Sequence, residues 1–179
     1  MIMKLNEKEC LDLLSKYNTP KHVINHCKAV SKVAFTIASA LNTKGYSLDA
    51  DLCKHAGLLH DMARVEDHHG EVAADKLSEL GYIREAEIIR VHMYHNEFNP
   101  IEKISEKDIV CISDRVVKEG DYVGFKIRMA HIRKKANYSP EVLKILDIKE
   151  KQLSDYIDSI ESIIGSSFDD LMEGIHEKD

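Results

Sequence analysis

A histidine and an aspartate stand side by side at positions 60 and 61, directly after the apolar segment 56–59. Adjacent residues on a helix point about 100° apart, so they share a target only where the helix ends or a cation lies between them. Imidazole and carboxylate are both good ligands for divalent transition metals. The alternative is that Asp61 caps the next turn and that His60 is a hydrogen-bonded core histidine.

The same residue types recur on or at the ends of other expected helices. The further candidate ligands are His26, His69, His92 and Asp114. Asp114 lies in a mostly apolar run, where an acid is costly unless it is paired or bound to a metal. Side chains from facing helices of a bundle can meet in its core and hold a metal there. The pattern therefore favours a metal site built from several remote segments.

Apolar residues spaced three and four apart predict helices along most of the chain. We expect them at residues 7–17, 20–41, 50–61, 69–80, 83–95, 106–117, 124–136 and 140–164. Thr19-Pro20 is a typical helix start, with Thr19 as the N-cap. No segment alternates as a strand does. The chain is predicted to be one all-α helical bundle, divided into an N-terminal helix (1–18), a metal-binding core (19–118), C-terminal helices (119–165) and an acidic tail (166–179) that frays.

Composition excludes several other classes of protein. The 179 residues are 44% hydrophobic and 31% charged, which is typical of a globular domain. A net charge of −6 disfavours general nucleic-acid binding. The cysteines Cys10, Cys27, Cys53 and Cys111 form no CxxC pair, and no signal peptide or membrane span is evident. A reduced, cytoplasmic protein is expected.

Five separated segments resemble the HD-domain superfamily of metal-dependent phosphohydrolases, in particular its HDIG-type hydrolases. In chain order they read VINHCKAVSKVA, AGLLHDMARV, HHGEVAADKL, IIRVHMYH and IVCISDRVVK, and they cover Thr19 to Lys118. The order of the five segments is specific, whereas the His-Asp pair alone would be weak. The chain departs from the family pattern in having Met62-Ala63 where Ile-Gly is usual, and in a second histidine displaced to His95.

The resemblance implies a helical bundle with one or two divalent metals. His26, His60, Asp61 and Asp114 would hold the first ion, and Asp61 would bridge to a second ion held by His69 and His92. Ligands of this kind suit iron, manganese, cobalt, nickel or zinc. We expect Asp61 and Arg64 to be catalytic. Substrate binding is assigned to a set of cationic or ionisable residues: Arg64, His95, Lys118 and Arg128.

The implied activity is hydrolysis of a phosphate ester or anhydride in a small nucleotide-like substrate, by water that the metal activates. Two alternatives remain: a non-catalytic domain that binds a nucleotide or metal and signals, and a di-iron oxygenase of the same fold. Aromatic residues at 94, 98, 122 and 125 suit either a bound base or the core. The apolar stripe 153–164 suits either the cap of the bundle or a second copy of the chain, so a homodimer is also left open.

Overall fold

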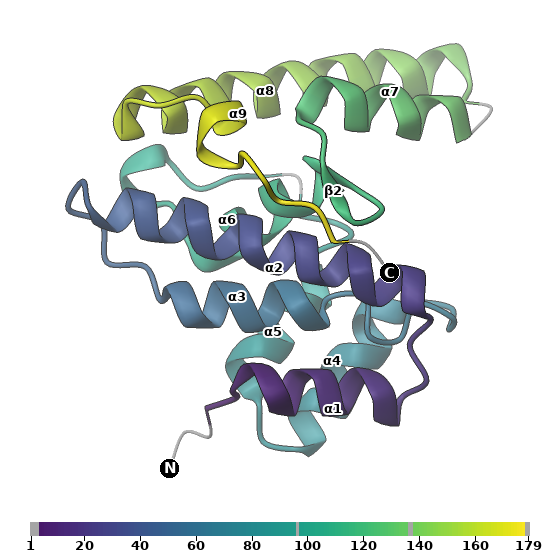
Figure 1. Ribbon diagram of the computed structural model, residues 1–179. Coiled ribbons are helices and arrows are strands. Elements are labelled where there is room, and N and C mark those ends of the chain that lie inside the picture. Colours follow the sequence, from purple (N-terminus) through teal and green to yellow (C-terminus); the bar gives the residue numbers. More distant parts are fainter. Residues whose placement is uncertain (1–3, 96, 136–137, 178–179) are drawn as a thin grey trace.

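The computed structural model describes residues 4–95, 97–135 and 138–177, and the chain they form is almost entirely helical (Figure 1). The first part of the chain forms α1 (Glu7–Lys16), α2 (Lys21–Asn42), α3 (Ala50–Leu59), α4 (His69–Glu79), α5 (Ile83–Val91), the short 3-10 helix η1 (Ile101–Lys103) and α6 (Glu106–Asp114). The two strands β1 (Val117–Lys118) and β2 (Asp121–Tyr122) follow, and then α7 (Phe125–Lys135), α8 (Pro140–Ile164) and α9 (Phe168–Leu171). The all-α prediction is confirmed.

The long helix α2 lies at the centre of the core and packs against α3 and α6. Its approach to α3 depends on Gly57, where an added Cβ would lie 3.0 Å from the Cα of Ser31. Pro20 is the N-cap of α2, so the prediction that Thr19 caps this helix is wrong. The Thr19 hydroxyl instead donates to the Met62 carbonyl at 2.8 Å, which ties the start of α2 to the turn after α3.

A two-stranded hairpin follows α6, although no strand was expected. Val117 pairs with Tyr122, and Lys118 pairs with Asp121. Strands of two residues are too short to show an alternating pattern in the sequence. The turn between them places Glu119 in the left-handed region, with φ of 55°.

The C-terminal residues up to Glu177 pack onto the domain, so the prediction of a frayed tail is wrong for them. Phe168 and Met172 are buried. The Tyr122 amide donates to the Ile175 carbonyl, and the Glu177 amide donates to the Gly120 carbonyl at 2.7 Å. The tail thereby extends the hairpin.

Helices α7 and α8 form a pair that lies across one side of the molecule (Figure 1). The second half of α8 turns Leu153, Ile157, Ile160 and Ile164 into the core, so this stripe caps the bundle. None of the helices described is long and apolar enough to cross a membrane.

Candidate metal centre

All six candidate ligands lie where helices begin or end, or one turn inside. His26 is in the second turn of α2, and His60 and Asp61 follow the last residue of α3. Since α3 ends at Leu59, the adjacent pair can converge, as the sequence required. The other ligands sit at helix termini too: His69 begins α4, His92 follows α5 and Asp114 ends α6.

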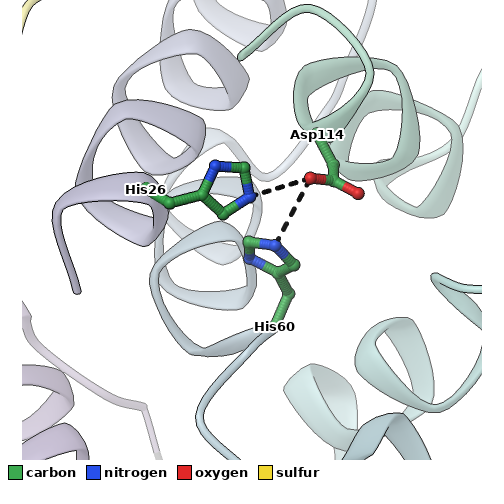
Figure 2. A group of neighbouring side chains, drawn as sticks. All are labelled: His26, His60 and Asp114. Carbon is green, nitrogen blue, oxygen red and sulfur yellow. Dashed lines mark hydrogen bonds and ion pairs between the residues drawn. The ribbon is translucent and has the colours of Figure 1, made fainter. Parts of the chain in front are cut away.

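The first triad consists of His26, His60 and Asp114 (Figure 2). The Asp114 Oδ1 atom lies 2.9 Å from His26 Nε2 and 3.6 Å from His60 Nε2. The other ring nitrogen of each histidine contacts a backbone carbonyl. His26 Nδ1 lies 3.1 Å from the Glu119 oxygen, and His60 Nδ1 lies 2.7 Å from the Gly57 oxygen. These contacts fix the rings so that both Nε2 atoms face the carboxylate.

The second triad consists of Asp61, His69 and His92. The Asp61 Oδ1 atom lies 3.0 Å from His69 Nε2 and 3.7 Å from His92 Nε2. His92 Nδ1 contacts the Ile89 carbonyl at 2.6 Å. The triads adjoin each other, because His60 Nε2 also lies 3.7 Å from the second oxygen of Asp61.

Three buried ring nitrogens point into this cluster without a hydrogen-bond partner among the described residues: the Nε2 atoms of His60, His69 and His92. A buried polar atom without a partner is costly. In His60 and His92, Nδ1 faces a backbone carbonyl, and when Nδ1 donates its proton there, Nε2 presents a lone pair, as metal-binding histidines usually do. The residues present therefore fit one or two divalent ions.

Comparison with known proteins agrees with this geometry. The HD domain family model matches residues 23–123, more than half of the chain and all six ligands. The chain belongs to the HD domain family. No solved structure matches it.

Two proteins are similar in sequence to part of this HD domain chain. An uncharacterized protein of Methanocaldococcus jannaschii is 45% identical over 65 residues, which is 35% of this chain and 38% of the relative. A tRNA (cytidine(56)-2'-O)-methyltransferase of Thermoplasma volcanium is 38% identical over 79 residues, 42% of this chain and 22% of that enzyme. The chain thus spans well under half of the length of these relatives.

In this HD domain, the two aspartates of the triads are held in their charged form. Burial alone would raise the pKa of Asp61, but the charge of His60 and the close approach of the His69 and His92 rings lower it far below its usual value. Burial likewise opposes ionisation of Asp114, and the hydrogen bond with His26 together with the nearby His60 ring lowers its pKa strongly. Burial would lower the pKa of His60, yet the negative charge of Asp61 raises it. The site therefore favours positive charge between the two carboxylates, which suits a divalent cation.

A cavity of about 560 Å³ opens above the two triads. Arg64 and Arg128, which the sequence analysis assigned to substrate binding, line it. Sequence reasoning missed three further cations on its wall, Arg115, Lys135 and Lys149. Arg115 was visible only as a neighbour of Asp114, and the two lysines look like ordinary solvated positions on helices. Phe98 and Phe125 also line the cavity, whereas Tyr94 and Tyr122 do not.

Two residues expected to bind substrate are placed elsewhere. His95 Nε2 lies 2.6 Å from Oδ1 of the buried Asp108, and His95 is not part of the cavity wall. Helix α5 ends at Val91, four residues earlier than expected, so His95 falls in the following loop. Lys118 belongs to β1 and is also absent from the wall. Neither residue lines the cavity that holds the two triads.

Proposed function

We propose that this HD domain is a metal-dependent phosphohydrolase of a small phosphorylated substrate. The observation that carries the proposal is the pair of adjoining triads, with buried Nε2 atoms facing one cluster at the floor of a cationic cavity. Divalent ions bound there would supply an activated water at neutral pH and polarise a phosphate ester. Hydrolysis joins the water oxygen to phosphorus, breaks the bond from phosphorus to the ester oxygen and releases the alcohol with a proton.

The residues around the triads suit the binding of phosphate. The Arg64 Nε atom lies 3.7 Å from Asp61 Oδ2, so its charge is next to the second triad. The Arg115 guanidinium donates to the His95 carbonyl at 3.0 Å and lies 5.9 Å from the centre of the Phe98 ring. Fixed cations of this kind stabilise charge that develops on phosphate oxygens without reorganising. Arginine in addition binds phosphate through paired hydrogen bonds.

The cellular setting and the assembly are part of the same proposal. All four cysteines are buried and free, which fits a reducing, cytoplasmic environment. The α8 stripe that suggested a homodimer is taken up by the core, so it does not support this part of the proposal.

The test combines elemental analysis of gently purified protein with a screen for released phosphate. The protein is loaded in turn with manganese, iron, cobalt, nickel and zinc, and is offered nucleotides and simple phosphomonoesters. We expect bound metal and metal-dependent release of phosphate. Asp61→Ala should lower turnover by more than about 100-fold, because even the loss of an outer contact to a metal ligand costs 10–100-fold. Circular dichroism should stay helical.

The control variant is Asp12→Ala, which removes an exposed acid on α1 and should leave turnover unchanged. Bound metal without phosphate release would favour a signalling domain. Oxygen consumption by the iron-loaded protein would favour an oxygenase. Protein that binds no metal would contradict the proposal outright.

A further inference from the structure

The cations of the cavity fall into two groups. Arg64 and Arg115 lie close in sequence to the ligands Asp61 and Asp114, at the floor. The second group, hereafter the roof cations, belongs to α7 and α8 and consists of Arg128, Lys135 and Lys149. One phosphate held at the triads can be bound by the floor cations, which leaves the roof cations available to another group of the same substrate.

The positive charge of the roof cations is largely uncompensated. Apart from the two metal-binding aspartates, the acid on the cavity wall is Glu150, which is already paired with Arg133 at 2.7 Å. Arg133 also pairs with Asp147. By contrast, the buried Nε atom of Arg128 has no hydrogen-bond partner among the described residues, although it lies on the same helix as Arg133.

The position of His131 agrees with this concentration of positive charge. His131 lies on α7 between Arg128 and Lys135. Its pKa is lowered by slight burial first, and then by the positive charges of Lys118, Lys135 and Arg128. Positive charge is therefore concentrated on this part of α7.

Apolar side chains line the cavity as well. They are Met93, Phe98, Phe125, Met129, Ile132, Leu146 and Leu153. The volume of about 560 Å³ lies in the range of small-molecule sites. A bare polyphosphate chain would gain little from this wall, whereas an uncharged organic body would bury apolar surface against it.

We propose that the substrate is an organic phosphate ester with a second phosphate, which the roof cations bind while the first phosphate is hydrolysed at the triads. This inference rests on the proposed phosphohydrolase function. Three cations suit a phosphate that carries close to two negative charges better than a carboxylate that carries one. The Arg128 guanidinium supplies a planar fork for two phosphate oxygens, and the lysines act as point charges.

The experiment compares adenosine 3′,5′-bisphosphate with adenosine 5′-monophosphate and 3′-monophosphate, which share one body and differ in the second phosphate. Phosphate release from each is measured with the metal-loaded full chain, and binding is measured by calorimetry. We expect kcat/KM for the bisphosphate to exceed that for either monophosphate by about tenfold or more, since a hydrogen bond to a charged group is worth at least that factor. The difference should lie mainly in KM.

Substitutions of the roof cations then test whether these cations cause the preference for the bisphosphate. Arg128→Gln and Lys149→Gln should each reduce the ratio of bisphosphate to monophosphate, and the double variant should bring it close to one. Arg128→Lys should retain part of it. The matched control is Lys144→Gln, which removes an exposed charge from α8 outside the cavity and should leave the ratio unchanged.

Equal kcat/KM for the bisphosphate and monophosphates, or a preference that survives in the double variant, would overturn the inference. If none of the three compounds is hydrolysed, calorimetry decides. Tighter binding of the bisphosphate that is lost in Arg128→Gln would support the second phosphate site even though the hydrolase proposal had failed for these compounds. Equal affinities would overturn it.

Discussion

The floor of the cavity and its roof are built in different ways. The floor consists of the helix ends of α2 to α6, where His60, His69 and His92 are buried and two of their rings are held by backbone carbonyls. The roof consists of α7 and the first half of α8, and α7 has no buried residue among those described. The side chains that would perform chemistry are thus fixed by the core. The side chains that would determine substrate specificity lie on α7 and α8, where substitutions should not disturb the core that holds the metal ligands.

The hairpin between α6 and α7 is not the sole link between the floor and the α7–α8 pair. The loop residues 97–100 before η1 carry Phe98 of the cavity wall, and the Asn99 carbonyl accepts a hydrogen bond at 2.8 Å from Tyr156 in the second half of α8. The C-terminal residues run back from α8 to the hairpin and α2 (Figure 1). Altering these connections, or the floor alone, tests whether the two layers are independent.

The largest effect, a loss of stability, is expected from substitution of Asp108, which anchors the loop to α6. This buried carboxylate accepts hydrogen bonds from the Asn99 amide at 2.9 Å and from the Ser105 amide at 2.8 Å, and it pairs with His95. Asp108→Asn should lower the free energy of unfolding by about 3 kcal/mol, because one partner of a buried pair is removed. Chemical denaturation followed by circular dichroism measures this.

The pH dependence of that difference provides the check. Burial would raise the pKa of Asp108, but the hydrogen bonds from His95, Asn99 and Ser105 outweigh it and lower the pKa below the usual 3.8. The stabilisation is therefore complete above about pH 4 and is lost as the pH falls through the lowered pKa. The difference in the free energy of unfolding between wild type and Asp108→Asn should become smaller only in that acidic range. A gap that is constant down to pH 2 would show that the charge is not responsible.

The floor could be predicted from the sequence more fully than the roof, of whose three cations only Arg128 was assigned to substrate binding, and the reasons are physical. Metal ligation restricts the residue types, and the order of the five segments that resemble the HD-domain superfamily implied that His26 and Asp114 share one ion although they are 88 residues apart. A cation on a solvated helix carries no such mark, which is why Lys149 was missed. His95 was assigned to substrate binding as the displaced second histidine of the family pattern, and nothing in the sequence marks Asp108 as its partner. Asp108 does cap α6, but its carboxylate binds His95 as well.

The next largest effect should be confined to the floor. At Gly70, beside the ligand His69, an added Cβ would lie 3.2 Å from Cε1 of His92 and 3.3 Å from the Ile89 carbonyl oxygen. Gly70→Ala should therefore displace His92 and weaken metal binding at the second triad by about 10–100-fold, as loss of an orienting contact does. Calorimetric titration with Co²⁺ measures this, with His92→Ala showing which binding step belongs to that triad.

A loss of metal binding in Gly70→Ala cannot be explained by the stability of α4, because the substitution affects helix stability in the opposite direction. In a helix, alanine is favoured over glycine by roughly 0.5–1 kcal/mol, so Gly70→Ala would stabilise α4 if the contact with His92 were harmless. Glu79→Ala, at an exposed position of the same helix, should leave both binding steps unchanged. Weaker binding at the first triad as well would mean that the triads are not independent.

The smallest effect is expected from the C-terminal residues, which reach the first triad indirectly. The Glu177 amide holds the Gly120 carbonyl, Glu177 pairs with Lys32 of α2, and the neighbouring Glu119 carbonyl holds Nδ1 of His26. Removing residues 173–179 should loosen this turn and weaken binding at the first triad by about tenfold, the lower end for an outer contact.

The matched control for that truncation is His176→Ala. It removes an exposed side chain that pairs with Asp121 but keeps the backbone hydrogen bonds of the tail. If its Co²⁺ titration matched that of the truncated chain, the Asp121 pair rather than the backbone would be responsible. If the truncated chain bound both ions like wild type, the Glu119 carbonyl would be held by the hairpin alone. The C-terminal residues, like the roof, would then be unnecessary for metal binding at the floor.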